Sequence, residues 1–430
     1  MAAAVILLLF ALIGTGMPLA FALGFVGALG VWLFAGFGPM LSFLATTPFS
    51  SASNYELMTI PMFVLMAEFV IISGIAEELF DTMDAWTRGI RGGLGLSTIA
   101  TGAMFSSICG SSAASAATLA STAIPQMRRH GYDLKLATGL TAITGTLSSM
   151  IPPANGLIIY GVLSEADLGR LLVAGLLPGL IGACVLAVTL QIQVRSNPAL
   201  IKSSSDAAVP MRERLRRLAR ILPIVVLFLL VMGVLYFGFG TATEASTLGA
   251  VGAALIALVR RRLTFGSLLT ALRNTLRVST MITLIITCAL LFGYFLTLSQ
   301  TTQNLTTFIG DLDTSRWVII SLLIAIKLVL GCFMDQVALL VLTVPITLPI
   351  VVRIGFDPIW YGIVLALTSE IGLVTPPIGL NAYIVARYTN IPVEQVFVGV
   401  WPYMLSMFLF LIVLVAFPGI TLFLPSLMHH

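Results

Sequence analysis

The sequence predicts an all-α polytopic membrane protein built from two inverted-topology repeats, and three observations lead to this prediction. Hydrophobic residues make up 58% of the 430 residues and charged residues only 9%, whereas a soluble domain carries about 25% charged residues. Arginine clusters divide the loops between two faces of a membrane. Pro, Gly, Arg and Asp residues of the first half recur in the second half at a fixed offset.

The composition also excludes several classes of protein. Apolar runs of helix-spanning length recur along the whole chain, and the weak period-2 alternation argues against a membrane barrel. The net charge of +4 comes from short basic loops, so we expect no nucleic acid. No CxxC metal pattern and no disulfide framework are expected from the cysteines. The first residues lack a basic n-region and predict a retained helix, not a cleaved signal.

The arginine clusters imply a re-entrant segment in the first half. We assign the clusters to the cytoplasmic side, where Lys and Arg are in excess. Residues 58–80 are predicted to span once and to end at a cytoplasmic loop, 81–91. Residues 93–127 then run between two cytoplasmic clusters, so a single span is impossible. Small polar residues and Gly110 lie at the centre of this segment and predict a re-entrant hairpin. The alternative is two full spans joined by a short external turn.

An internal repeat relates the two halves of the chain. A shift of 224 residues places Pro-Pro at 152–153 on Pro-Pro at 376–377, and a shift of 225 places Leu23 and Gly24 on Leu248 and Gly249. The shift of 224 also pairs Pro125, Arg129, Gly131, Asp133, Gly175 and Pro178 with Pro349, Arg353, Gly355, Asp357, Gly399 and Pro402.

Counting the crossings turns the second repeat upside down. We predict spans at about 219–238 and 245–259, a cytoplasmic amphipathic arm at 263–278 and an outward crossing at 279–299. The resulting domains are 1–193, the first repeat, with a re-entrant hairpin at about 93–127 and a broken helix at about 133–163; 194–218, a basic cytoplasmic loop; and 219–430, the second repeat, with a hairpin at about 317–351 and a broken helix at about 357–386.

Helix breaks in mid-membrane supply the expected chemistry. A broken helix exposes free carbonyls, which suit Na⁺, and free N–H groups, which suit an anion. Such breaks persist in hydrocarbon only where protein, water or a ligand satisfies them. We therefore predict Na⁺ ligation, mostly by backbone, near Ser107, Gly110, Gly145, Thr146, Pro152, Gly331, Met334, Asp335, Thr375 and Gly379. Substrate contacts are predicted at Ser111, Ser112, Asn155, Thr375 and Asn381.

Structural interpretations of the same residues stay open. The Ser/Ala run after Gly110 is also typical of close helix packing. Each Pro-Pro pair is also typical of a simple helix kink. Asp335 is either a helix cap or an ion ligand. Glu370 is either a functional buried acid or a structural hydrogen-bonding group. Lys327 is expected to snorkel or to form an ion pair, and Glu68 is equally ambiguous.

Several motifs carry a family resemblance over nearly the whole chain. IPQMRRHGYD, IPPANGLIIYGV, AGLLPGL, GCFMDQVALLVLTVPITLPI, GFDP and TPPIGLNAYIVA resemble the large membrane subunit of tripartite ATP-independent periplasmic (TRAP) transporters, which are DctM-like. The chain departs from the family pattern at two positions. Cys109 stands where a Ser is frequent at the first tip, and Ala154 where a Ser commonly follows the first Pro-Pro, which puts hydroxyl ligands there in doubt.

The resemblance implies a Na⁺-driven symporter of elevator type in the bacterial inner membrane. It also implies an organic-acid substrate, such as a dicarboxylate or sialic acid, and two partners: a small four-helix membrane subunit and a periplasmic substrate-binding protein. No cofactor is expected besides Na⁺ as coupling ion. A stand-alone Na⁺- or H⁺-coupled organic-anion carrier of the same superfamily is the alternative. A channel is a second alternative. An intramembrane hydrolase is a third, but the HExxH and GxSxG motifs of such enzymes are missing from the sequence. The solute, the ion stoichiometry, the oligomeric state and the origin of His429 and His430 are not decided by the sequence.

Overall fold

The structure, a computed structural model, describes residues 1–201, 209–310 and 314–428. These residues form α-helices, short 3-10 turns and connections, with one isolated bridge between Tyr132 and Ile201. Seven of the described helices are long and apolar enough to cross a membrane. The prediction of an all-α polytopic membrane protein is therefore confirmed. His429 and His430 lie outside the described residues.

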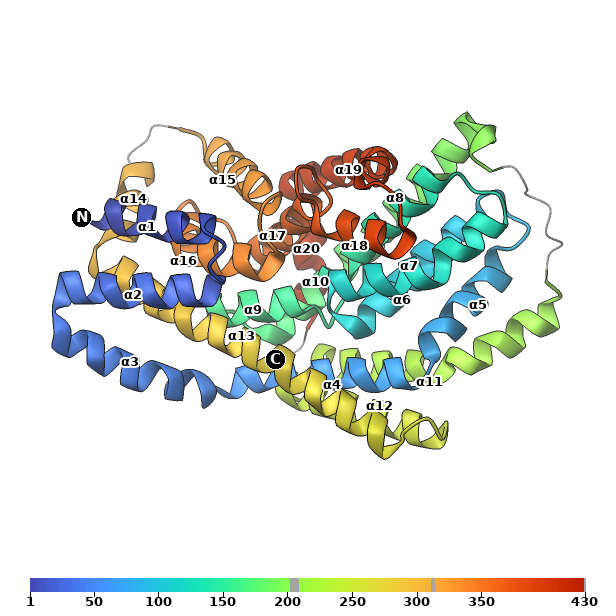
Figure 1. The fold of residues 1–430 in the computed structure, drawn as a ribbon, viewed down its shortest axis with the longest axis horizontal. Coiled ribbons are helices and arrows are strands. Elements are labelled where there is room, and N and C mark those ends of the chain that lie inside the picture. The colour runs from blue at the N-terminus through green and yellow to red at the C-terminus, as the bar shows by residue number, and fades with distance from the viewer. Residues whose placement is uncertain (202–208, 311–313, 429–430) are drawn as a thin grey trace.

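The first half of the chain contains ten α-helices among its described residues. Two of them, α6 and α7, form the first hairpin, and α8 and α9 are the two parts of the first broken helix (Figure 1). The helices are α1 (Ala2–Gly14), α2 (Leu19–Ala35), α3 (Phe37–Ala52), α4 (Thr59–Ile72), α5 (Ile75–Thr87), α6 (Gly93–Cys109), α7 (Ser112–Arg129), α8 (Leu134–Gly145), α9 (Asn155–Ser164) and α10 (Leu168–Ser196).

The second half repeats this order. Here α15 and α16 form the second hairpin, and α17 and α18 are the parts of the second broken helix. The two hairpins lie on either side of a central group that includes α9, α10 and α17 (Figure 1). The helices are α11 (Met211–Tyr236), α12 (Ala242–Val259), α13 (Phe265–Leu298), α14 (Thr301–Gly310), α15 (Arg316–Gly331), α16 (Gln336–Arg353), α17 (Pro358–Gly372), α18 (Leu380–Thr389), α19 (Val393–Ala416) and α20 (Gly419–Ser426).

The contacts between the two halves are reciprocal. The internal shift makes α2 the counterpart of α12 and α4 the counterpart of α13; α2 packs on α13, and α12 packs on α4. In the same way α7 packs on α18, and their counterparts α16 and α9 pack on each other. Each of these contacts between the two halves thus occurs a second time between the counterpart helices. Such reciprocal contacts indicate an approximate two-fold axis between the halves.

Helix directions show that the repeats are inverted. A Cβ on Gly24 would lie beside Cys288 and one on Gly30 beside Phe295, so α2 and α13 run parallel. Thr59 bonds Thr243 and Gly249 faces Met66, so α4 and α12 also run parallel.

The short connection 260–264 joins α12 to α13, and such a connection joins antiparallel helices. Contacts of α4 agree with this: α4 runs parallel to α12, and Glu68 near the end of α4 accepts a hydrogen bond from Asn274 near the start of α13. Hence α2 and its counterpart α12 point in opposite directions, as inverted repeats require.

Three predicted helix bounds are corrected. The span predicted at 58–80 ends at Ile72, because Gly74 turns the chain at φ +75°, a conformation open to glycine; residues 75–87 then form α5, where we expected a loop from residue 81. The arm at 263–278 and the crossing at 279–299 form one helix, α13, because no Gly or Pro stands between residues 267 and 292 to end it.

The third correction concerns the basic loop predicted at 194–218. Helix α10 continues to Ser196, and α11 begins at Met211. The run MRERLRRLAR that opens α11 consists almost entirely of strong helix formers. Residues 202–208 of the predicted loop lie outside the described residues.

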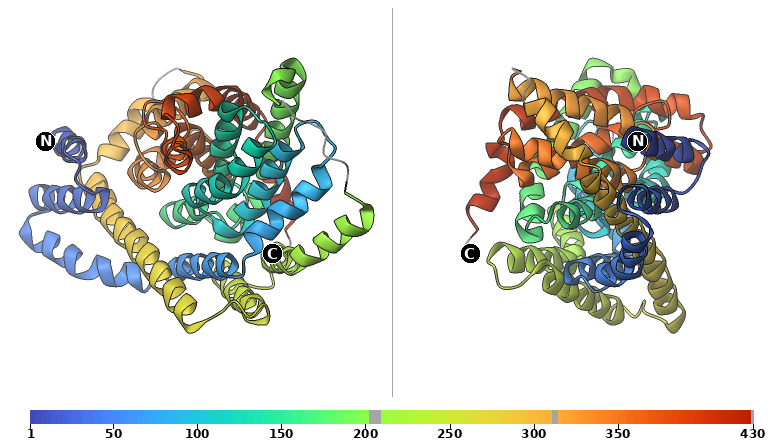
Figure 2. Two further views of the ribbon diagram at one scale, coloured as in Figure 1. Left: turned by 45° about the vertical axis from the view of Figure 1, so that its right-hand side comes forward. Right: turned by 90° about the vertical axis from the view of Figure 1, so that its left-hand side faces the viewer.

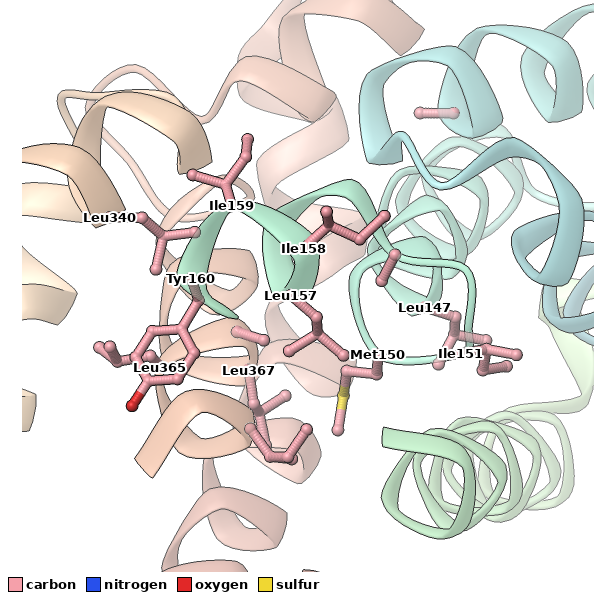
Figure 3. Close-up of a cluster of buried hydrophobic side chains, with 14 of the residues drawn as sticks. Leu147, Met150, Ile151, Leu157, Ile158, Ile159, Tyr160, Leu340, Leu365 and Leu367 are labelled. Carbon is pink, nitrogen blue, oxygen red and sulfur yellow. The ribbon is translucent and has the colours of Figure 1, made fainter. Parts of the chain in front are cut away.

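Small residues bring the backbones of the central helices together. A Cβ on Gly399 of α19 would lie 1.8 Å from the carbonyl oxygen of Lys135 in α8. The apolar core continues around the first break, where Ile159 and Tyr160 of α9 lie near Leu340 of α16 and Leu365 of α17 (Figure 3). The helices α1, α2 and α3 lie at one edge, beside α13 (Figure 2). The broken helices are therefore held at the junction of the two repeats.

Candidate functional site

The tip of the first hairpin lies directly against the first Pro-Pro break. Gly110 ends α6 at φ +61°, and Ser111 caps α7 by accepting a hydrogen bond from the amide of Ala114. The amide of Asn155, the first residue of α9, donates to the carbonyl of Gly110 at 3.1 Å. A Cβ at position 110 would lie 2.5 Å from the carbonyl oxygen of Pro153. Tip and break thus form one compact unit.

Buried serines fasten this unit from within. The hydroxyl of Ser148, in the 3-10 turn η2 (Thr146–Ser149), donates to Ser115 Oγ at 2.6 Å and lies 3.0 Å from Ser106 Oγ. All three side chains are buried. They connect both arms of the first hairpin to the end of the α8 segment. Sequence reasoning did not single out these serines, because a Ser in a Ser/Ala-rich helix is equally typical of close packing.

The second tip is built on the same plan but is more open. Asp335, the counterpart of Ser111, caps α16 by accepting a hydrogen bond from the amide of Ala338 at 3.2 Å. Gly331 packs against Gly372 at the end of α17, where a Cβ would meet backbone at 2.7 Å. The side chain of Phe333 is 56% exposed. Residues 376–378 at the second break are exposed, whereas residues 152–154 at the first are buried.

The predicted ligand residues fall into two groups. At the first tip and break lie Ser107, Gly110, Ser111, Ser112, Gly145, Thr146, Pro152 and Asn155. At the second tip and break lie Gly331, Met334, Asp335, Thr375, Gly379 and Asn381. Asn381 is fully buried, and neither its Oδ1 nor its Nδ2 has a partner. The hydroxyl of Thr375 donates to the carbonyl of Ile371 at 2.5 Å.

The two halves of the site are joined by a contact that sequence reasoning missed. Ser149 of η2 bonds both Gln336 Oε1 of α16, at 3.0 Å, and the carboxylate of Glu370 in α17. A Cβ on Gly156 would collide with the amide of Gln336, so this side chain reaches across to α9. Nothing in the sequence distinguishes Gln336 from an ordinary first-turn residue.

Two helix N-termini at the breaks carry no side-chain cap. The helices α9 and α18, which are counterparts, start at the Pro-Pro segments, and no side chain of the described residues caps them. The amides of Asn155 and Asn381 donate to the backbone carbonyls of Gly110 and Leu373. Five neighbouring helices are capped instead, by Ser111, Asp133, Asp167, Asp335 and Asp357. The positive end of a helix dipole suits an anion. This arrangement exists once in each repeat.

Two crevices lie where the second arm of each hairpin ends, and they are counterparts. One has a volume of about 830 Å³ and is lined by Pro349, Arg353 and Glu165 among others. The other has a volume of about 740 Å³ and is lined by Pro125, Arg129 and Thr389 among others. The internal shift places each of these three residues on its partner. With the arginine clusters of the first half on the cytoplasmic side, the predicted crossings place the second crevice inside and the first outside, where Arg353 is an exception to the charge rule.

Lys327 corrects a prediction. It neither snorkels nor pairs with an acid among the described residues. Only 1% of it is exposed, and its Nζ donates to Thr347 Oγ1 at 2.9 Å and to the hydroxyl of Tyr361 at 2.6 Å. The Tyr361 hydroxyl also donates to Thr347 at 2.8 Å. This triad ties both arms of the second hairpin to α17.

Charged side chains outside the membrane gather on α5. Asp84 pairs with Arg88, and Glu78 pairs with Arg260 at 2.8 Å. Burial raises the pKa of Asp81, and the nearby Arg217 guanidinium partly opposes this rise. Glu68 accepts a hydrogen bond from Asn274 at 3.2 Å. These contacts join α4 and α5 to α11, α12 and α13.

Comparison with known proteins gives a consistent result. Residues 6–420 match the family model of the tripartite ATP-independent periplasmic transporter, DctM component. The chain is 33% identical to the C4-dicarboxylate TRAP transporter large permease protein DctM of Pseudomonas aeruginosa, over 94% of this chain and 93% of that one. It is 30% identical to the sialic acid TRAP transporter large permease protein SiaM of Vibrio cholerae, over 97% and 96%.

A solved structure supports the fold alone. The crystal structure of the Alcanivorax borkumensis YdaH transporter, described as having an unusual topology, matches with a TM-score of 0.66 over 89% of this chain and 90% of that one. The sequence identity of that pair is 12%.

Proposed function

The chain belongs to the DctM-component family of TRAP transporters, a family of multi-pass inner-membrane permeases and not of enzymes, and on this premise we propose that it imports a small organic acid in symport with Na⁺. The observation that carries the proposal is the pair of hairpin tips and broken helices at the junction of inverted repeats. Such junctions form the midplane sites of secondary transporters.

The anion end of the proposal rests on the uncapped helices α9 and α18. No side chain of the described residues caps these N-termini. The amides of Asn155 and Asn381 donate to the backbone carbonyls of Gly110 and Leu373, so the proposal depends on the positive helix ends, which favour a carboxylate. Asn155 and Asn381 stand at the first turns of these helices, and Asn381 has both side-chain polar atoms unpartnered although it is fully buried. A buried amide without a partner is costly, and a bound carboxylate would supply one.

Names of relatives support the substrate class. Members of the family are named for C4-dicarboxylates and sialic acid, and a permease named DctMQ from Oleidesulfovibrio alaskensis for isethionate, with 29% identity over 95% of this chain and 64% of that one. All of these solutes are small organic acids. We propose the same class here.

The cation end rests on the carbonyl ends of α6, α8, α15 and α17. These ends carry the negative pole of the helix dipole, and oxygen-bearing side chains stand at the tips, the Ser107 hydroxyl at the first and the Asp335 carboxylate at the second. Hard oxygen ligands of this kind suit Na⁺. A coupling ion at each tip would neutralise the negative helix ends while the anion neutralises the positive ones.

We propose that transport follows an elevator mechanism. The moving part would hold both hairpins and both broken helices, and the static part would include the reciprocal pairs α2 with α13 and α4 with α12. The proposed partners are a small four-helix membrane subunit and a periplasmic substrate-binding protein. A stand-alone carrier of the same superfamily is the second candidate.

Uptake into proteoliposomes tests this function. The chain, the small subunit and a binding protein loaded with labelled organic acid would be reconstituted with an inward Na⁺ gradient, with K⁺ in its place, or with a proton gradient alone. We expect accumulation only with the Na⁺ gradient and only with the binding protein present. Accumulation with the proton gradient alone would contradict Na⁺ coupling, and accumulation without the binding protein would favour the stand-alone carrier.

A further inference from the structure

A buried carboxyl group lies where the two repeats meet, outside the proposed Na⁺ ligand sets. Glu370 is 1% exposed. Its Oε1 accepts a hydrogen bond from Ser149 Oγ, and its Oε2 has no partner. Ser112, from the first hairpin, lies beside the same carboxyl group, and Gln336, from the second, bonds the same Ser149 hydroxyl at 3.0 Å. Three segments of the two repeats thus converge on this group.

Every polar group that this cluster brings to Glu370 is neutral, namely those of Ser149, Ser112 and Gln336. Ser149 has one hydroxyl hydrogen, and it faces both Glu370 Oε1 and Gln336 Oε1. The Nε2 of Gln336 has no partner, which suggests the opposite amide orientation. In that orientation Nε2 donates to Ser149, Ser149 donates to Glu370, and Gln336 Oε1 becomes the unpartnered atom. In both orientations the side chains beside the Glu370 carboxyl group, those of Ser149 and Ser112, are neutral, so the amide orientation does not supply a positive charge.

No basic side chain among the described residues forms an ion pair with Glu370. The described ion pairs of this chain involve other acids, namely Asp84, Glu213 and Glu78. Lys327, the buried cation of α15, donates to Thr347 and Tyr361 instead. The other charged groups on α17 and on the elements packed against it stand at or near helix ends: Arg316, Asp335, Arg353, Asp357, Glu165, Asp167, Arg170, Arg195 and Glu394. A buried ionised carboxylate without a partner is very costly.

We propose that Glu370 is a monovalent-cation site in which a proton or a Na⁺ ion supplies the missing charge, a proposal that rests on the carrier function above. A proton would make Glu370 a donor and leave the cluster neutral. A Na⁺ ion would find oxygen ligands in Glu370, Ser149, Gln336 and Ser112. In either case the site joins η2 of the first repeat to α16 and α17 of the second, so its occupancy favours the arrangement in which these segments are in contact.

Thermal unfolding of the purified full chain tests the site without any transport assay. The wild type would be melted over a range of pH and of Na⁺ concentration, alongside Glu370→Gln and the matched control Glu394→Gln, which removes an exposed acid at the start of α19. If the cation is a proton, the wild-type Tm falls as pH rises, because ionising the buried acid costs the folded state, and Glu370→Gln loses this fall. If it is Na⁺, Glu370→Gln loses part of the stabilisation by Na⁺.

Ser149→Ala keeps the test decisive if Glu370→Gln does not fold. This variant removes the donor that favours the ionised carboxylate. If the cation is a proton, the midpoint of the pH-dependent change in Tm should therefore rise by about one to two pH units. If the cation is Na⁺, the Na⁺ concentration that gives half-maximal stabilisation should rise about tenfold. The proposal would be overturned if the Tm of Glu370→Gln depended on pH and on Na⁺ as the wild-type Tm does. If Glu370→Gln does not fold, the same result for Ser149→Ala would overturn it. Since no uptake is measured, this result is separate from failure of the proposed function.

Discussion

The amide of Asn155 donates to the carbonyl of Gly110 at 3.1 Å and so closes the first hairpin tip onto the first break. The internal shift places Met334 and Gly379 at the equivalent positions of the second repeat, where no such bond joins the described residues. Phe333 and the second Pro-Pro segment are exposed instead. The two repeats therefore differ in local arrangement, one closed and one open, although their sequences align without a gap here.

Replacing Gly110 with alanine tests the closed tip. The new Cβ would lie 2.5 Å from the carbonyl oxygen of Pro153, and φ at this position is +61°. We expect a loss of about 2 kcal/mol or more of stability, from left-handed strain plus the clash, and at least a tenfold loss of uptake. Melting temperature and initial uptake rate are the measurements.

Gly233→Ala is the matched control for this change. It lies in α11, and a Cβ there has nothing within 4 Å. Alanine favours a helix interior over glycine by roughly 0.5–1 kcal/mol, so the control should melt at the same temperature or slightly higher. Equal melting temperatures and uptake rates in the two variants would show that Gly110 is not confined as described.

Removing one hydroxyl tests the buried lysine triad. Tyr361→Phe takes one acceptor from Lys327, which then keeps only Thr347 at 2.9 Å. Since the ammonium group stays buried, we expect a loss of about 1–3 kcal/mol of stability. Denaturation of the detergent-solubilised protein measures it.

Tyr403→Phe provides the comparison. Tyr403 is also fully buried, but its hydroxyl has no partner, so its removal should be neutral or stabilising. If both variants lose the same stability, the bonds of Lys327 to Tyr361 contribute nothing specific.

Much of the fold could be predicted from the sequence because its signals are local or repeated. Hydropathy and arginine placement depend on the bilayer and not on tertiary contacts, and the offset of 224 made each Pro-Pro segment support the other. Helix bounds were less predictable. Gly74 ended a span that hydropathy continued, while nothing interrupted α13 where we expected an arm to end.

The contacts within the site were beyond the sequence. Lys327 was expected to snorkel, because its partners Thr347 and Tyr361 lie 20 and 34 residues away along the chain. Ser149, Gln336 and Glu370 come together only because the two repeats pack on each other. The difference between the closed and open tips is likewise absent from the sequence, since both tips share the capping pattern of Ser111 and Asp335.

Thiol labelling from each side of the membrane tests the central claim, the inversion of the repeats, most directly. Arg129 and Arg353 are counterparts, and both are exposed at the mouths of the two crevices. In a background without the four native cysteines, a membrane-impermeant maleimide added to intact cells should label Arg353→Cys and should label Arg129→Cys only after the membrane is opened. Labelling of both positions from the same side would contradict the account.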